Sequence, residues 1–189
     1  MTPSAPSVLF VCVKNGGKSQ MAAALMRHRA EEASLNVDVH SAGTRPGNTV
    51  NQLSAEVISE AGADMAAEVP KPIDADLLGR ADRVIVLGDD ARVEPVEDMR
   101  ATIETWHTDE PSHRGIEGAE RMRLVRDDID QRIRTLLTEL TATLGPHNEV
   151  GNPTDVSVAD PLAGHCSYSQ HALPAGVETA AERLTNPAI

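Results

Sequence analysis

The chemistry of this chain is concentrated in residues 10–19, FVCVKNGGKS. Cys12 ends an apolar run, and a loop with two adjacent glycines leads from it to Lys18 and Ser19. The backbone N–H groups of a loop between a strand and a helix can converge on an anion, and the helix dipole favours the negative charge there. A cysteine at the base of such a loop is placed to attack as a thiolate. The spacing therefore predicts a thiol nucleophile beside a bound oxyanion.

Each position of the loop has a predicted role. Gly16 and Gly17 lack the Cβ atoms that would block the turn, and Asn15 tolerates a left-handed backbone. Lys18 is expected over the oxygens of the anion, and Ser19 is expected to donate to the thiolate and to cap the following helix. The alternative is a buried structural cysteine beside an ordinary glycine turn. The predicted oxyanion-binding loop comprises Val13, Lys14, Asn15, Gly16, Gly17, Lys18 and Ser19.

The loop requires a strand before it and a helix after it, and the hydrophobic pattern predicts both. Residues 8–13 form a continuous apolar run, which is typical of a strand buried on both faces. Apolar residues at helical spacing predict a helix over 19–33. The remaining predicted elements are strands at 37–41, 83–88 and 103–106, a helix at 51–61 with Leu53, Val57 and Ile58 facing inward, and a long helix at 117–143.

The alternation of strands and helices predicts an α/β fold. We expect three layers, α/β/α, around a central and mainly parallel four-stranded sheet. Three segments are expected along the chain: a flexible N-terminus at 1–6, a catalytic domain at 7–143, and a C-terminal tail at 144–189. The tail contains five prolines and few bulky apolar residues, which favours partial disorder.

The composition of the chain argues against several classes of binding partner. The formal net charge is −12, which argues against binding to nucleic acid or to an anionic membrane. The first residues lack the basic and apolar regions of a signal peptide, and the apolar runs are too short to span a membrane. Two cysteines do not make a disulfide framework. We therefore expect a reduced, cytoplasmic protein with no membrane or nucleic-acid partner.

The loop resembles the phosphate-binding loop of the low-molecular-weight tyrosine phosphatase fold, whose pattern is Cys-x5-Arg-Ser/Thr. NGGKSQMAAA is more similar to the arsenate reductases on that fold. Lysine in the arginine position is a feature of the arsenate–mycothiol transferases, which this chain resembles most. The likeness covers about residues 7–143. It is also carried by HSAGT at 40–44, NQLSAEVISEAGADM at 51–65, DRVIVLGDDA at 82–91, WHTDEP at 106–111 and ERMRLVRDDIDQRI at 120–133.

The resemblance implies a mechanism. Arsenate would bind in the loop, with phosphate as a competing anion, and Cys12 would attack arsenic. The family's general acid lies just before a proline, which corresponds to Glu110, with Asp109 beside it; both stay open as the acid, and solvated loop carboxylates are the alternative. Ser41, with Asn15 and Ser19, matches the hydrogen-bond network that supports the loop. No bound cofactor and no metal site are predicted.

The source of the second thiol follows from the cysteine count. Thioredoxin-coupled members of the family carry two resolving cysteines after the LGDD strand, and residues 89–112 contain none. The resemblance therefore implies mycothiol as co-substrate and a mycoredoxin-like reductase as protein partner. Cys166 leaves three interpretations: an incidental tail thiol, a resolving cysteine, or a metal ligand with His165 and His171.

Two other functions stay open. The first is a phosphatase acting on phosphotyrosine or a small phosphoester, although Lys18 offers a point charge where arginine would offer two parallel donors. The second is a binding module without catalysis, for which Cys12 would be unnecessary. The arginines at 121, 123 and 126 are interpreted as a solvated helix face.

Overall fold

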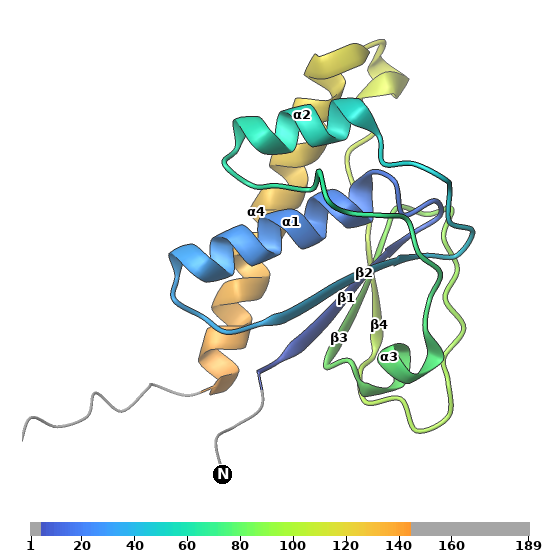
Figure 1. Cartoon of the computed structure of the whole chain (residues 1–189), viewed down its shortest axis with the longest axis vertical. Helices are drawn as coiled ribbons and strands as arrows, with labels where there is room; N and C mark the ends of the chain where they lie inside the picture. Colours follow the sequence, from blue (N-terminus) through green and yellow to red (C-terminus); the bar gives the residue numbers. More distant parts are fainter. Residues whose placement is uncertain (1–4, 145–189) are drawn as a thin grey trace, which may run out of the picture. The chain divides into compact units, whose positions relative to one another are not determined.

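The structure is a computed structural model that describes residues 5–144. The predicted tail, with Cys166 and the histidines beside it, lies outside the described residues. Four strands form one sheet, in the spatial order β2-β1-β3-β4, and all three pairings are parallel. The strands are β1 (Ser7–Cys12), β2 (Asp38–Gly43), β3 (Arg83–Leu87) and β4 (Ile103–Trp106) (Figure 1). The predicted parallel four-stranded sheet is confirmed.

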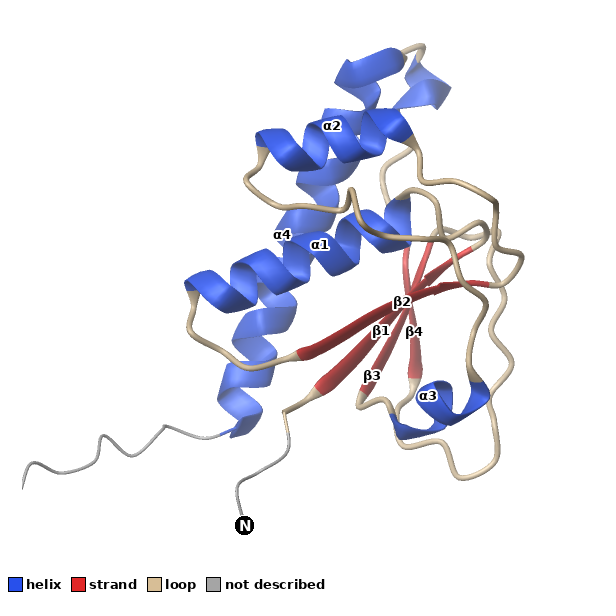
Figure 2. Cartoon of the chain, in the orientation of Figure 1, coloured by secondary structure: helices blue, strands red, loops and turns tan. Residues whose placement is uncertain are grey.

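Helices cover both faces of the sheet, as the three-layer prediction requires (Figure 2). The helices α1 (Lys18–Glu32), α2 (Gln52–Glu60) and α4 (Gly118–Leu144) pack together on one face, where Phe10 points into their core. The other face is covered by the short helix α3 (Ala75–Arg80) and by the loop after β3, over Leu9 and Val11. Neighbouring β1 residues thus serve opposite cores, which explains why the strand is buried throughout and is apolar from Val8 onward.

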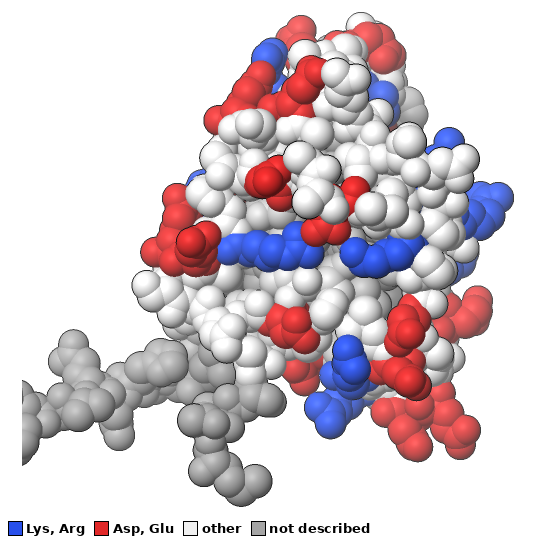
Figure 3. Space-filling view, in the orientation of Figure 1, with Lys and Arg blue, Asp and Glu red and all other residues white. Residues whose placement is uncertain are grey.

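The first helix lies close to the sheet because its central residues are small. Three successive alanines, Ala22 to Ala24, are all buried, and Met21 and Leu25 fill the space beside them. Arg29 joins this helix to α4 through two hydrogen bonds to Asp130, of 2.8 and 3.0 Å. On the face of the molecule shown in Figure 3, acidic side chains lie around and between the basic ones.

Two sequence predictions are wrong, and two elements were not predicted. Leu53 does not face inward: it is 38% exposed, and Ser54 is buried in its stead. Asn51 caps α2 by accepting from the backbone N–H of Ser54, which fixes the rotation of the first turn and turns Leu53 toward solvent. Ser19 does not cap α1, because the helix begins at Lys18 and Gly17 occupies the N-cap without a side-chain bond. The α3 helix and a 3₁₀ turn, η1 (Pro111–Arg114), were not predicted.

Candidate active site

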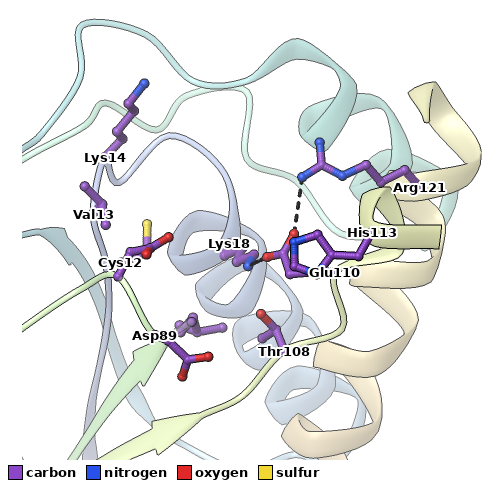
Figure 4. A pocket seen from close by; sticks show the side chains of 12 residues that line it. Cys12, Val13, Lys14, Lys18, Asp89, Thr108, Glu110, His113 and Arg121 are labelled. Atoms are coloured by element: carbon purple, nitrogen blue, oxygen red, sulfur yellow. Dashed lines mark hydrogen bonds and ion pairs between the residues drawn. The ribbon is translucent and has the colours of Figure 1, made fainter. Parts of the chain in front are cut away.

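The predicted loop follows β1 at the carboxyl edge of the sheet, where the ends of parallel strands meet. Cys12 is the last residue of β1 and lies at one wall of a cavity of about 530 Å³. Figure 4 shows Cys12, Lys18 and Glu110 among the side chains that line this cavity. The cavity is lined by Cys12, Val13, Lys14, Lys18, Leu87, Gly88, Asp89, Asp90, Thr108, Glu110, His113 and Arg121.

Two donors converge on the sulfur of Cys12. The backbone N–H of Asn15 donates to Cys12 Sγ at 3.2 Å, and Ser19 Oγ lies 3.0 Å from the same sulfur. Ser19 Oγ already accepts from Asn15 Nδ2 at 2.9 Å, so its own hydrogen is free to point at Cys12. Donors aimed at sulfur stabilise the thiolate, which is the nucleophilic form. The arrangement suits attack on an electrophilic centre held above the loop.

Asn15 organises this part of the loop. Its backbone is left-handed, with φ of 49°, and its side chain is fully buried. The backbone N–H of Lys71 donates to Asn15 Oδ1 at 2.9 Å. Because a backbone N–H can only donate, that contact fixes the amide oxygen toward Lys71 and the amide nitrogen toward Ser19. The loop that carries Lys71 is distant in sequence, yet it fixes the Asn15 amide. Through that amide it orients the Ser19 hydroxyl beside Cys12.

Ser41 joins the network through a residue that the sequence did not single out. Ser41 Oγ donates to Gln20 Oε1 at 3.2 Å, and Gln20 Nε2 donates to Asn15 Oδ1 at 3.2 Å. Gln20, Ser41 and Asn15 are all fully buried. Ser41 therefore supports the loop from beneath and does not contact the thiol. Glutamine directly after Ser19, in a helix that packs on the sheet, was the available signal for this link.

Close backbone approaches explain one of the two loop glycines. A Cβ on Gly16 would lie 2.9 Å from the carbonyl oxygen of Thr49, whereas one on Gly17 would meet nothing closer than 3.5 Å. A side chain would therefore clash at Gly16 but not at Gly17. The prediction that both glycines are needed to avoid a Cβ clash is wrong for Gly17. Gly43, at the end of β2, is equally crowded, because its Cβ would lie 2.9 Å from the carbonyl oxygen of Val13.

Lys18 is bound by the predicted acid. Its Nζ donates to Glu110 Oε1, and Arg121 Nη2 lies 3.4 Å from Glu110 Oε2. Burial alone raises the pKa of the Glu110 carboxyl, but the hydrogen bond and charge of Lys18, with those of Arg121, outweigh it and hold that pKa below its usual range. Glu110 is therefore a carboxylate that binds two cations.

Asp109 is turned away from this cluster. Its carboxylate accepts two hydrogen bonds from Arg114, of 2.7 and 2.8 Å, and it does not line the cavity. The hydrogen bonds of Arg114 hold the pKa of Asp109 below its usual range. The two candidates for the acid thus differ in place: Glu110 lines the cavity and binds Lys18, whereas Asp109 binds Arg114 outside it.

Seven cavity residues were not predicted as site residues: Leu87, Gly88, Asp89, Asp90, Thr108, His113 and Arg121. Arg121 was expected on a solvated helix face, yet it reaches the cavity because α4 begins at Gly118, directly above the loop that carries Glu110. His113 comes from η1 and Thr108 from the loop after β4. Asp89 lines the cavity and its Oδ1 contacts His107 Nδ1. Only the three-dimensional paths of the segments after β3 and after β4 bring these side chains together.

Within residues 5–144, no three His, Cys, Asp or Glu side chains are grouped so that they could hold a metal ion. No helix in the same range is both long and apolar enough to cross a bilayer.

Comparison with known proteins agrees with this arrangement. The family model described as low molecular weight phosphotyrosine protein phosphatase matches residues 7–145. The chain belongs to the low molecular weight phosphotyrosine protein phosphatase family. The match covers the sheet, the loop after β1 and the segment that carries Glu110, and it confirms the fold class that the resemblance implied.

Three relatives of this family are arsenate reductases by name. A putative arsenate reductase from Halobacterium salinarum is 32% identical over 132 residues, covering 69% of this chain and 89% of that protein. A solved thioredoxin-dependent arsenate reductase from Corynebacterium glutamicum is 30% identical, with a TM-score of 0.58; the likeness covers 76% of this chain and 65% of that one. A solved arsenate reductase in a phosphate-binding state is 25% identical, with a TM-score of 0.59, over 72% of this chain and 99% of that one. The chain therefore groups with arsenate reductases of the phosphatase fold.

Proposed function

We propose that the protein is an arsenate reductase that captures arsenic on Cys12 and passes it, still as arsenic(V), to a low-molecular-weight thiol. The observation that carries the proposal is the placement of Cys12, whose sulfur receives the Asn15 N–H and the Ser19 hydroxyl beside a cavity that holds Lys18 and Glu110. The names of the relatives support arsenate as the substrate, and the phosphate-bound relative supports phosphate as a competing anion.

The first step forms a bond between Cys12 Sγ and arsenic and breaks one arsenic–oxygen bond. The departing oxygen needs a proton, since it leaves as water. The carboxyl groups of Asp89, Asp90 and Glu110 line the cavity, and Glu110 is the proposed proton donor because it binds the loop cation Lys18. Its proton has to be acquired when the anion draws Lys18 away, because the hydrogen bond and charge of Lys18 lower the pKa of Glu110.

The second step transfers arsenic to the acceptor. A thiolate forms a new sulfur–arsenic bond, the bond to Cys12 breaks, and Cys12 leaves as a thiolate, so no atom changes oxidation state. Cys12 is the only cysteine among residues 5–144. The acceptor is thus either an external thiol or Cys166. Mycothiol is the proposed acceptor, a mycoredoxin-like protein is the proposed reductant of the conjugate, and the site is proposed to work in the cytoplasm.

The competing reductant is thioredoxin, because the relative from Corynebacterium glutamicum is named as thioredoxin-dependent. A thioredoxin relay passes electrons through resolving cysteines in the protein itself. The segment from Asp89 to Ser112, which follows β3 and carries the predicted acid, has no cysteine. This absence favours the external thiol.

The test is a single turnover with arsenate and mycothiol, followed by mass spectrometry of product and protein. Wild type and Cys166→Ser are expected to give the same arseno-mycothiol product, and Cys12→Ser is expected to give none. A disulfide between Cys12 and Cys166, or product from the wild type but not from Cys166→Ser, would overturn the external acceptor. Turnover by Cys12→Ser at the wild-type rate would overturn the whole proposal.

A phosphatase is the second candidate, because the same nucleophile, loop and acid serve phosphoryl transfer and the family match is to phosphatases. The distinguishing measurement is hydrolysis of para-nitrophenyl phosphate. Hydrolysis by the wild type that exceeds arsenate turnover would favour the phosphatase. We expect weak hydrolysis, since Lys18 lacks the two parallel donors that an arginine would offer a phosphoryl group.

A further inference from the structure

The cavity contains a cation that the loop motif does not include. Arg121 is in the first turn of α4, and its side chain is 34% exposed. Its Nη2 contacts Glu110 Oε2 at 3.4 Å, while its Nε is buried and has no hydrogen-bond partner among the described residues. A buried donor without a partner has a free-energy cost, so an oxygen of a ligand that accepts from Nε would be favoured.

The geometry of the guanidinium shows what that group would be. Nε and Nη2 lie on one edge and can give two parallel hydrogen bonds to two oxygens of a carboxylate or a tetrahedral oxyanion. Arg123, two residues further along, uses this edge on Glu60, with bonds of 2.8 and 2.7 Å. Arg121 uses the same edge for one long contact only. The Nε half of this binding edge therefore has no partner among the described residues.

Lys18 and Arg121 also bind the same carboxylate, that of Glu110. Each contacts a different oxygen of Glu110, so the carboxylate sits between two cations (Figure 4). Lysine 18 is a point charge without a bidentate edge. A second cation that does have this edge, on the wall of the same cavity, is suited to the geometric part of the task that a loop arginine would perform.

We propose that Arg121 is an oxyanion-binding residue, which supplies from α4 the two-pronged contact that Lys18 cannot make. This inference rests on the proposed function, because it concerns the anion of the same site. When the oxyanion enters, Lys18 and Arg121 exchange Glu110 for its oxygens. Glu110 then loses both cations and can take up a proton, which couples substrate binding to formation of the acid.

The experiment measures binding of inorganic phosphate and of arsenate by calorimetry, without added thiol. The variants are Arg121→Met, which removes the charge, and Arg121→Lys, which keeps the charge but not the bidentate edge. Arg123→Met is the matched control, since Arg123 lies on the same helix and its partner Glu60 is outside the cavity. Melting temperature is measured for each protein, so that a loss of fold is separated from a loss of binding.

We expect Arg121→Met to weaken phosphate binding at least tenfold, Arg121→Lys to weaken it about three- to tenfold, and Arg123→Met to change it by less than twofold. Affinity in Arg121→Met within twofold of the wild type would overturn the inference. If Arg121→Met does not fold, Arg121→Lys decides: wild-type affinity in it would also overturn the bidentate role.

The inference and the proposed function can fail separately. Phosphate binding that depends on Arg121, without arsenate turnover by the wild type, would uphold the inference and reject the reductase. If the wild type turns over arsenate but Arg121→Met binds the anion as tightly as the wild type, the reductase is upheld and the inference is rejected. No binding of either anion to the folded wild type would reject both.

Discussion

We expect the hydrogen bonds around Cys12 to depend on Asn15. This residue contributes both its side-chain hydrogen bonds and a left-handed backbone, and two replacements separate these contributions. Asn15→Ala and Asn15→Gly both remove the side-chain amide. They differ in the backbone, because Asn15 has a φ of 49°, which glycine adopts freely and alanine does not. Comparing the two variants therefore measures the hydrogen bonds and the backbone strain independently.

Three hydrogen bonds of the side chain are lost in either variant. They join Asn15 to Ser19 Oγ at 2.9 Å, to the N–H of Lys71 at 2.9 Å and to Gln20 Nε2 at 3.2 Å. All three partners are left in or near the core, so each loss costs about 1 kcal/mol and the sum is about 3 kcal/mol. Alanine adds about 1 kcal/mol for the left-handed backbone. We expect Asn15→Gly to lose about 3 kcal/mol of unfolding free energy and Asn15→Ala about 4 kcal/mol.

The assay is urea denaturation followed by circular dichroism, with Cys166→Ser as the background so that Cys12 is the only thiol. In the same proteins, the alkylation rate of Cys12 by iodoacetamide at pH 7 reports the thiolate. We expect that rate to fall about tenfold in both variants, since the Ser19 hydroxyl loses the bond that orients it. Losses below about 1 kcal/mol, or an alkylation rate equal to that of the background protein, would refute the role given to the network.

Three further outcomes are expected. Gly43→Ala destabilises the protein by more than about 3 kcal/mol in urea titration, because its Cβ would lie 2.9 Å from the backbone oxygen of Val13; a loss below about 1 kcal/mol would contradict the crowding. Gly79→Ala, in α3, stabilises it by about 0.5–1 kcal/mol in the same titration, since the new Cβ makes only ordinary contacts; destabilisation would contradict this. Burial raises the pKa of Asp130, but the hydrogen bonds of Arg29 and Arg134 outweigh burial and lower that pKa. The ionised Asp130 therefore stabilises the fold above the pKa of the unfolded state, and this stabilisation is lost as the pH falls through the pKa of the folded state. Asp130→Asn therefore costs about 2 kcal/mol at pH 7, and its deficit in urea titrations narrows below about pH 4; a deficit independent of pH would refute the ion pair.

The sheet could be predicted from sequence because its central strand is buried on both faces. β1 and β3 appear in the sequence as continuous apolar runs, and their observed ends differ from the predicted ends by a single residue. The α3 helix was missed for the opposite reason. It has six residues, of which only Leu78 is buried, so it is too short to show a helical period.

The helix α2 shows a second limit. Its existence and length were predicted well, but its rotation was not, and Leu53 was placed inward. The spacing of apolar residues predicts a helix but does not fix which side faces the core. Here the hydrogen bond from the Ser54 N–H to Asn51 fixes the rotation of the first turn. A nine-residue helix offers too few apolar positions to correct such an error from sequence.

The candidate site divides in the same way. Residues of the loop lie within eight positions of Cys12, and the strand–loop–helix order is sufficient to bring them together. Glu110 is 92 positions from Lys18, and its place followed only from the family resemblance. Arg121 had no signal of either kind, because its position over the cavity depends on where α4 begins and how it is rotated. Chemistry that is local in sequence is predictable from a motif, whereas contacts between distant elements need the fold.

The lysine at position 18 is explained by the charges around it. The chain carries a net charge of −12, and the cavity is lined by as many acidic as basic side chains. The attraction for an oxyanion therefore has to come largely from the loop N–H groups and the start of α1. With the anion held in that way, the loop cation need not grip it alone. An arginine at this position would bind Glu110 through two parallel bonds and keep it ionised, whereas the single bond of Lys18 is more easily exchanged for the substrate. A weaker partner for the acid suits a site in which the acid has to be released as the substrate arrives.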